Sequence, residues 1–194
     1  MKDESSEIMV QKIQTTTDNL AQTAIWLIID PWQSQPSVTK DSVSAFEKTF
    51  KDNKGLCYPA INAEEYLKEC TYQNNINHYH CVKIKEYMQR VKTKYTVLND
   101  RYEMSDVFKE TGDAAQRKFP TFEHSKISKY IKDFDTIVYV GFHHGRCTID
   151  RKDSGAEVMS KTHKIYFKKD LLCLMPGDSW IEMDEKSKKY GTLI

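Results

Sequence analysis

The sequence has almost no net charge, no apolar segment long enough to cross a membrane, and no closely spaced pair of cysteines. Its 194 residues include 29 basic and 28 acidic side chains, which gives a formal charge of +1 at pH 7. So small a net charge provides no long-range field to attract nucleic acid or an anionic membrane surface. We therefore expect neither a nucleic-acid partner nor a membrane partner.

Disulfide and targeting signals are also missing. The cysteines form an odd, widely spaced set without a C-x-x-C motif: Cys57, Cys70, Cys81, Cys147 and Cys173. This differs from the disulfide framework of a small secreted protein. The N-terminal segment MKDESSEIMV is acidic and lacks the apolar core of a signal peptide. These observations predict a cytoplasmic protein with no targeting segment.

The length fits one domain with a core that needs no disulfide or metal for stability. Residues 1–21 are polar and are expected to form an N-terminal arm, and residues 22–194 a single domain. Within that domain, residues 31–73 are rich in turn formers and charges and form a long insertion. A connection of this length often carries substrate contacts.

Apolar segments and amphipathic segments alternate along the domain. Strands are predicted at 24–29, 95–100, 136–141 and 164–173, and helices at 74–92, 122–132 and 147–161, with one short helix in 174–194. This order predicts an α/β fold of three layers, α/β/α, with a mainly parallel central sheet. Ligands of such sheets bind beyond the carboxyl ends of the strands. The polar residues that follow the strands are therefore the candidates for a functional site.

Two of these residues suit covalent catalysis. Cys147 lies in the first turn of a predicted helix, where backbone N–H groups and the helix dipole favour a thiolate. Asp30 ends the first apolar strand, where partial burial is expected to raise its proton affinity toward that of a general base. The alternatives are a small, half-buried apolar cysteine and an aspartate that caps a turn.

A lysine is the third candidate. Lys118 belongs to the segment RKFPTF, in a polar loop before a predicted helix, from where its ammonium group would lower the pKa of the cysteine. The alternative is an ordinary surface lysine, and Lys109 is a second candidate for the same role.

The histidines do not form a recognised metal motif. His143 and His144 are adjacent, so their side chains diverge, and with Cys147 they lack a known zinc spacing. We expect no metal ion and no cofactor. On the helix predicted at 74–92, His80 is expected to face the interior and His78 the surface.

Five segments together resemble the isochorismatase-like cysteine hydrolases: IIDPWQ, KFPTF, IVYVGFHHGRC, TIDRKDSGAEVM and KIYFKKD. They follow one another in the family's order over residues 24–173. The resemblance implies a Rossmann-like fold and a catalytic triad of Asp30, Lys118 and Cys147. It also implies a homo-oligomer, either a dimer or a tetramer.

The resemblance has further implications for the site. A cis peptide bond between Phe142 and His143 would aim the N–H groups of His143 and Cys147 into the pocket as an oxyanion hole. The expected substrate-binding residues are Trp32, Tyr102, Phe119, His143 and His144. The nicotinamidase branch carries an Asp-x-His metal motif where this chain has Asp100-Arg101-Tyr102, so nicotinamidase activity is not expected.

The predicted activity is hydrolysis of an amide or a related non-peptide C–N bond in a small molecule. Cys147 would attack the carbonyl carbon, Asp30 would carry the proton, and Lys118 would stabilise the thiolate. The alternative is a catalytically silent binding or assembly module that uses residues 31–73 to hold a partner. A second enzymatic alternative, vinyl-ether hydrolysis of the isochorismate type, needs the aspartate but not the cysteine, and the presence of Cys147 argues against it.

Overall fold

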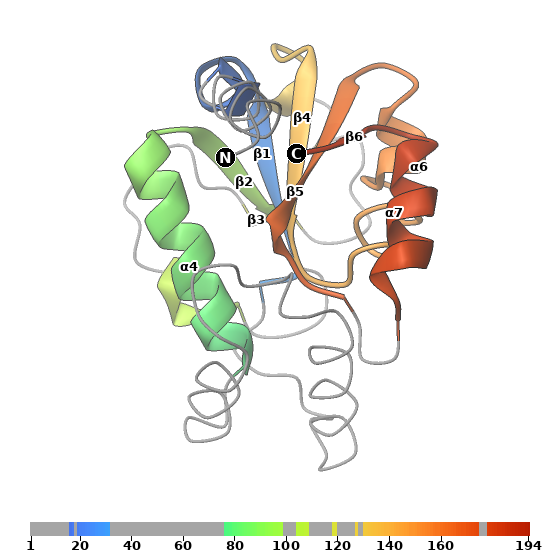
Figure 1. Ribbon diagram of the computed structural model, residues 1–194. Coiled ribbons are helices and arrows are strands. Elements are labelled where there is room, and N and C mark those ends of the chain that lie inside the picture. Colours follow the sequence, from blue (N-terminus) through green and yellow to red (C-terminus); the bar gives the residue numbers. More distant parts are fainter. Residues whose placement is uncertain are drawn as a thin grey trace, which may run out of the picture.

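The described part of the chain is a central β-sheet with helices on both faces (Figure 1). The computed structural model describes residues 16–17, 19–31, 76–98, 104–108, 118–119, 127, 130–174 and 178–194. None of the helices within these ranges is both long and apolar enough to cross a membrane.

Six strands form the sheet in the order β3-β2-β1-β4-β5-β6, and every neighbouring pair is parallel. Their bounds are β1 Ile25–Ile29, β2 Lys94–Leu98, β3 Lys118–Phe119, β4 Thr136–Gly141, β5 Lys164–Leu172 and β6 Thr192–Leu193. The two central strands, β1 and β4, are apolar and are buried along almost their whole length, as parallel strands covered on both faces are. The predicted three-layer α/β fold is confirmed.

One face of the sheet packs against α4 (Ile76–Val91). Trp26 of β1 lies on this face, with its ring 5.3 Å from the ring of Tyr87. Cys81, Ile84 and Met88 follow one another at three- and four-residue steps along the helix, and all are buried. A short 3₁₀ helix, η1 (Asp106–Phe108), packs beside α4.

The opposite face packs against the C-terminal helices. Successive residues of a strand point to opposite faces, so Leu27, Tyr139 and Phe167, which share one register row, face away from α4. Phe167 contacts the ring of His144, which in turn lies 5.5 Å from Trp180 at the start of α7. Figure 1 shows α6 (Ala156–Met159) and α7 (Trp180–Lys188) across the sheet from α4.

Several predicted elements differ from the structure. Lys118 and Phe119 form the edge strand β3 rather than part of a loop, and β6 was not predicted. The helix predicted at 147–161 is reduced to the four residues of α6, because residues 144–150 fold as a series of turns. Ile127 and Ile131, which belong to the helix predicted at 122–132, are buried, whereas Tyr130 is 36% exposed.

The domain prediction is only partly covered by the described residues. Leu20 and Ala21, which the prediction assigns to the arm, are buried in the core. Residues 1–15 and 32–75 lie outside the described ranges. The arm and the insertion at 31–73 therefore stay predictions.

Gly141 allows the end of β4 to lie close to the backbone of β1, and a substitution at this glycine tests that contact. Its φ angle is +107°, and a Cβ atom there would lie 2.4 Å from the carbonyl oxygen of Ile29. We expect Gly141→Ala to lower the free energy of unfolding by about 3 kcal/mol, since it adds both a clash and backbone strain. Urea denaturation would measure the change, with Ser160→Ala as a control expected to stay within about 0.5 kcal/mol of wild type. Equal stability of the two variants would show that this close approach does not exist.

A buried histidine links α4 to the end of β5. His80 is fully buried, as predicted, and its Nε2–H donates to the carbonyl oxygen of Leu171 at 3.1 Å. Burial lowers the pKa of His80 from 6.5 to about 4, and the Leu171 hydrogen bond only partly opposes this shift. His78 is half-buried rather than fully exposed.

The lowered pKa predicts acid-sensitive stability. Between pH 6.5 and pH 4 the unfolded chain binds a proton at His80 that the folded chain excludes, so the His80 contribution is present above pH 6.5 and is lost as pH falls. This loss is up to about 3 kcal/mol by pH 4. His80→Gln should flatten the dependence of unfolding free energy on pH. Parallel pH profiles for wild type and His80→Gln would contradict this assignment.

Candidate functional site

The candidate site lies where β1 and β4 end. The Asp30 N–H donates to the carbonyl oxygen of Leu98 at 2.7 Å, which holds the residue in line with the sheet. Asp30 and His143 both have positive φ angles, +52° and +57°. Non-glycine residues in this left-handed region carry a small conformational cost, and such residues gather at functional sites. Their backbone conformation alone therefore makes these two residues candidates for a functional site.

The Asp30 carboxylate is fully buried and has a partner on each oxygen. Arg151 donates to Oδ1 at 2.9 Å, and its own side chain is only 8% exposed. The other oxygen, Oδ2, lies 3.4 Å from Nδ1 of His143. Both partners come from the segment after β4, so this one carboxylate connects β1 to that segment.

These partners shift the pKa of Asp30 in the direction opposite to the one expected. Burial raises the pKa of the carboxyl group, but the hydrogen bond from His143, the Arg151 guanidinium and the Cys147 thiol together lower the pKa below its ordinary value of 3.8. The prediction of a raised pKa was wrong because it considered burial without the hydrogen bond to His143 and the Arg151 guanidinium. Asp30 is consequently a stable anion at neutral pH.

Cys147 completes the cluster. Its Sγ lies 3.7 Å from Nδ1 of His143, and ligand atoms of Asp30, His143 and Cys147 all lie within 4.8 Å of one another. Cys147 is half-buried, whereas Cys81 and Cys173 are buried. Burial raises the pKa of Cys81 to about 12. Among these three cysteines, Cys147 is the one with both solvent access and a neighbouring base.

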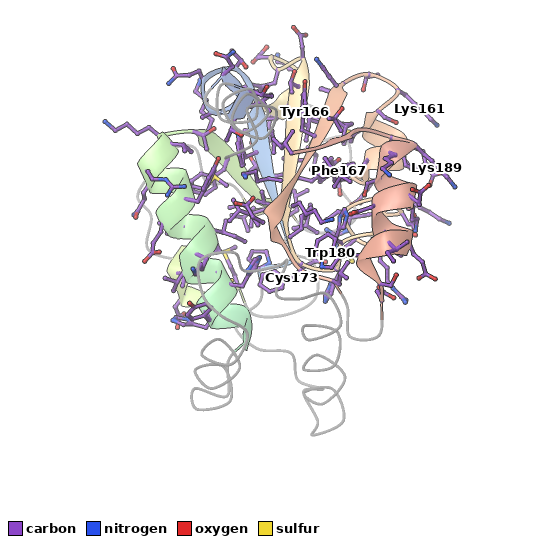
Figure 2. The ribbon with its side chains drawn as sticks, in the orientation of Figure 1. Lys161, Tyr166, Phe167, Cys173, Trp180 and Lys189 are labelled. Atoms are coloured by element: carbon purple, nitrogen blue, oxygen red, sulfur yellow. The ribbon has the colours of Figure 1, made fainter. Side chains whose placement is uncertain are left out.

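The turn that contains His143 and Cys147 is held against α7 by hydrogen bonds of the His144 side chain. Thr148 Oγ1 lies 3.0 Å from Nδ1 of His144, and Ser187 Oγ of α7 lies 2.9 Å from Nε2. The His144 N–H donates to the carbonyl oxygen of Cys173. Figure 2 labels Cys173 and Trp180 near each other, below Phe167. His144 is completely buried and packs on the α7 side. Its role in lining a substrate pocket stays a prediction.

Two further expectations about this turn differ from the structure. The peptide bond between Phe142 and His143 is trans, so the predicted cis bond was wrong. Cys147 lies within a turn rather than at the start of a long helix, and its N–H donates to the carbonyl oxygen of His143 at 2.9 Å. The helix-dipole argument for a thiolate therefore does not apply. The oxyanion hole assigned to the N–H groups of His143 and Cys147 stays a prediction, and one of its two donors is already engaged within the turn.

Several predicted site residues cannot be placed beside this cluster. Lys118 and Phe119 lie in β3, where Lys118 pairs with Val97 and Phe119 with Leu98, and their side chains lie outside the described part of the chain. Trp32, Tyr102 and Lys109 lie wholly outside it. Of the predicted residues, the structure thus brings together Asp30, His143 and Cys147.

Arg151 is the functional residue that sequence reasoning did not assign. It follows Cys147 by four residues, just as Cys147 follows His143 by four. In a chain that turns with roughly helical periodicity, residues four apart share one side. Applied to HHGRCTIDR, this spacing groups the histidine, the cysteine and the arginine.

Two arginine–aspartate pairs of equal length provide a matched test of the cluster. Arg151 and Asp30 are buried, while Arg146, 58% exposed, donates to Asp178 at the same 2.9 Å. We expect Arg151→Met to cost about 3–5 kcal/mol, since it leaves a buried carboxylate without its cation. Arg146→Met should cost less than about 1 kcal/mol. Chemical denaturation of both variants would measure the difference, and similar losses would contradict the burial of the Asp30 pair.

Comparisons with family models, with curated proteins and with solved structures gave no match to this chain. The resemblance to the isochorismatase-like hydrolases therefore stays a prediction from five sequence segments. What the structure contributes independently is the parallel sheet and the cluster of Asp30, His143, Cys147 and Arg151 at the ends of its central strands.

Proposed function

We propose that this protein is a cysteine hydrolase that cleaves an amide or a related C–N bond of a small molecule. The observation that carries the proposal is the convergence of the Cys147 thiol, the His143 imidazole and the Asp30 carboxylate within 4.8 Å. A thiol, a base and an anion that orients the base are the three groups that covalent acyl transfer requires. The chemistry is thus argued from this cluster and not from the family resemblance alone.

The first half-reaction forms a thioester. In the tautomer that carries its proton on Nε2, His143 Nδ1, 3.7 Å from Sγ, accepts the thiol proton. The Nδ1–H group formed in this step then donates to the Asp30 carboxylate at 3.4 Å, which stabilises the imidazolium. The thiolate attacks the carbonyl carbon and forms a C–S bond. The tetrahedral intermediate collapses with cleavage of the C–N bond, and His143 returns the proton to the leaving amine.

The second half-reaction consumes water. His143 removes a proton from a water molecule, the resulting hydroxide adds to the thioester carbonyl, and the C–S bond breaks. The thiolate regains its proton from the imidazolium, so that one amide and one water give one acid and one amine. Throughout both steps Asp30 stays ionised, because Arg151 and His143 stabilise its charge.

This assignment moves the proton-carrying role from Asp30 to His143 and gives Asp30 a positioning role. Lys118 keeps its proposed place beside the thiolate on the strength of the resemblance alone, since it lies in β3, two strands away from β1 in the sheet. Trp32, Tyr102 and Phe119 keep their proposed role in contacting the substrate.

We infer the setting of the reaction from less specific features. Cys81, Cys147 and Cys173 are free thiols, as is usual in a reducing compartment, which supports a cytoplasmic location. The formal charge of +1 supports a small-molecule substrate rather than a polyanion. The proposed assembly, a homodimer or homotetramer, rests on the family resemblance.

A screen of small amides and carbamoyl compounds for ammonia release tests the activity directly. We expect turnover that falls by more than about 10³-fold in Cys147→Ala and by about 10²–10⁴-fold in His143→Gln, since the first removes the nucleophile and the second its base. Cys173→Ala should retain activity. Ammonia release that persists in Cys147→Ala would rule out covalent catalysis at this cysteine.

Selective alkylation distinguishes the hydrolase from a silent binding module. At neutral pH, iodoacetamide should modify Cys147 faster than the exposure of its sulfur explains, and His143→Gln should slow the modification by more than about tenfold. Peptide mapping by mass spectrometry would measure the rate at each cysteine. A rate at Cys147 that is unchanged in His143→Gln would favour the silent module.

A further inference from the structure

The same cluster has the composition and the spacing of a metal site. Asp30, His143 and Cys147 each offer one ligand atom, and these atoms lie within 4.8 Å of one another; no second such group occurs among the residues that the structure describes. The sequence expectation of no metal considered the two adjacent histidines with Cys147. The structure buries His144 elsewhere and places Asp30 in the cluster instead.

Two of the three separations within the cluster match those of ligands around a tetrahedral zinc ion, and the third, between Cys147 Sγ and the Asp30 carboxylate, is at most 4.8 Å. With ordinary zinc bond lengths, tetrahedral ligands would lie about 3.4 Å apart for a nitrogen and an oxygen and about 3.6 Å apart for a sulfur and a nitrogen. The corresponding separations are 3.4 Å between His143 Nδ1 and Asp30 Oδ2, and 3.7 Å between Cys147 Sγ and His143 Nδ1. By contrast, 3.4 Å is long for a direct hydrogen bond between nitrogen and oxygen.

The donor types select the kind of ion. Thiolate and imidazole favour zinc and similar borderline metals, whereas magnesium and calcium require sites made mainly of oxygen. Arg151 donates to the other carboxylate oxygen, Oδ1, and so orients Oδ2 toward His143 as outer-shell donors orient metal ligands. Three protein ligands leave the fourth position of a tetrahedron for water or for a small ligand.

We propose that Asp30, His143 and Cys147 bind one zinc-like divalent cation, and that the bound cation masks the Cys147 thiol. On binding, the metal–sulfur bond replaces the S–H bond, and the thiol proton is released to solvent. The sulfur lone pair and the His143 nitrogen, which nucleophilic attack requires, are then both held by the metal. The regulatory consequence rests on the proposed function: free zinc would switch the hydrolase off, and its removal would restore activity.

Cobalt titration tests the binding without any substrate. Co²⁺ added to metal-free protein should give one equivalent of binding, with a near-ultraviolet thiolate-to-cobalt charge-transfer band that excess Zn²⁺ abolishes. The band should be absent in Cys147→Ser. His143→Gln and Asp30→Asn should weaken binding by more than about tenfold, because each removes a ligand. Cys173→Ala and His163→Gln are matched controls that should bind as wild type does.

Cys147→Ser replaces one sulfur with an oxygen at a half-buried position, so we expect this variant to fold. The titration therefore still tests the proposal if Asp30→Asn impairs folding. A wild-type protein that is folded by circular dichroism and gives no charge-transfer band would overturn the proposal. A band of equal strength in Cys147→Ser would also overturn it, since the metal would then be bound by another cysteine.

Zinc protection of the thiol tests the masking. Saturating Zn²⁺ should slow alkylation of Cys147 by more than about tenfold, and a chelator should restore the rate. An alkylation rate that saturating Zn²⁺ leaves unchanged would contradict the masking. Neither readout requires turnover, so a failed ammonia screen would end the proposed function and leave the metal site standing, and the reverse also holds.

Discussion

The buried carboxylate of Asp30 is the constraint on which the rest of the site depends. A fully buried anion is tolerated only when nearby positive or hydrogen-bonding groups compensate the loss of solvation. Here Arg151 and His143 supply that compensation, and both belong to the segment after β4. The ion pair therefore brings β1 and this segment together, and it places Cys147 within reach of the same atoms. Glycine at position 141 makes the close approach of the two strands sterically possible.

Much of the fold was predictable because parallel strands leave a local signal. The continuous apolar runs at β1 and β4 identified the central strands, and the three- and four-residue spacing of residues such as Ile84, Tyr87 and Met88 identified α4. The predicted helix from Cys147 failed for a tertiary reason. The His144 ring lies within hydrogen-bond distance of Thr148 in the same turn and of Ser187 in α7, and these contacts hold residues 144–150 in turns. The contact with Ser187 joins residues 43 positions apart and leaves no periodicity in the sequence.

Residues of the candidate site could be predicted from the sequence, but the roles proposed for them could not. The rule that functional residues follow the buried strands of a parallel sheet pointed to both Asp30 and Cys147. The direction of the Asp30 pKa shift was missed, because it depends on His143 and Arg151, residues 113 and 121 positions away in the sequence. The same pairing makes Asp30 a lasting anion, so His143 is the better proton carrier. A metal ion would use these same three side chains, which is why catalysis and metal binding would exclude each other.

The central claim is that Asp30 and His143 act on Cys147 as one unit. A double-mutant cycle on the alkylation rate of Cys147, with Asp30→Asn, His143→Gln and the combined variant, measures this coupling directly. If the carboxylate works by orienting and stabilising the imidazole, the combined variant should react no more slowly than His143→Gln alone. Rate losses that multiply in the combined variant would show that the two residues act on the thiol independently, and would contradict the account.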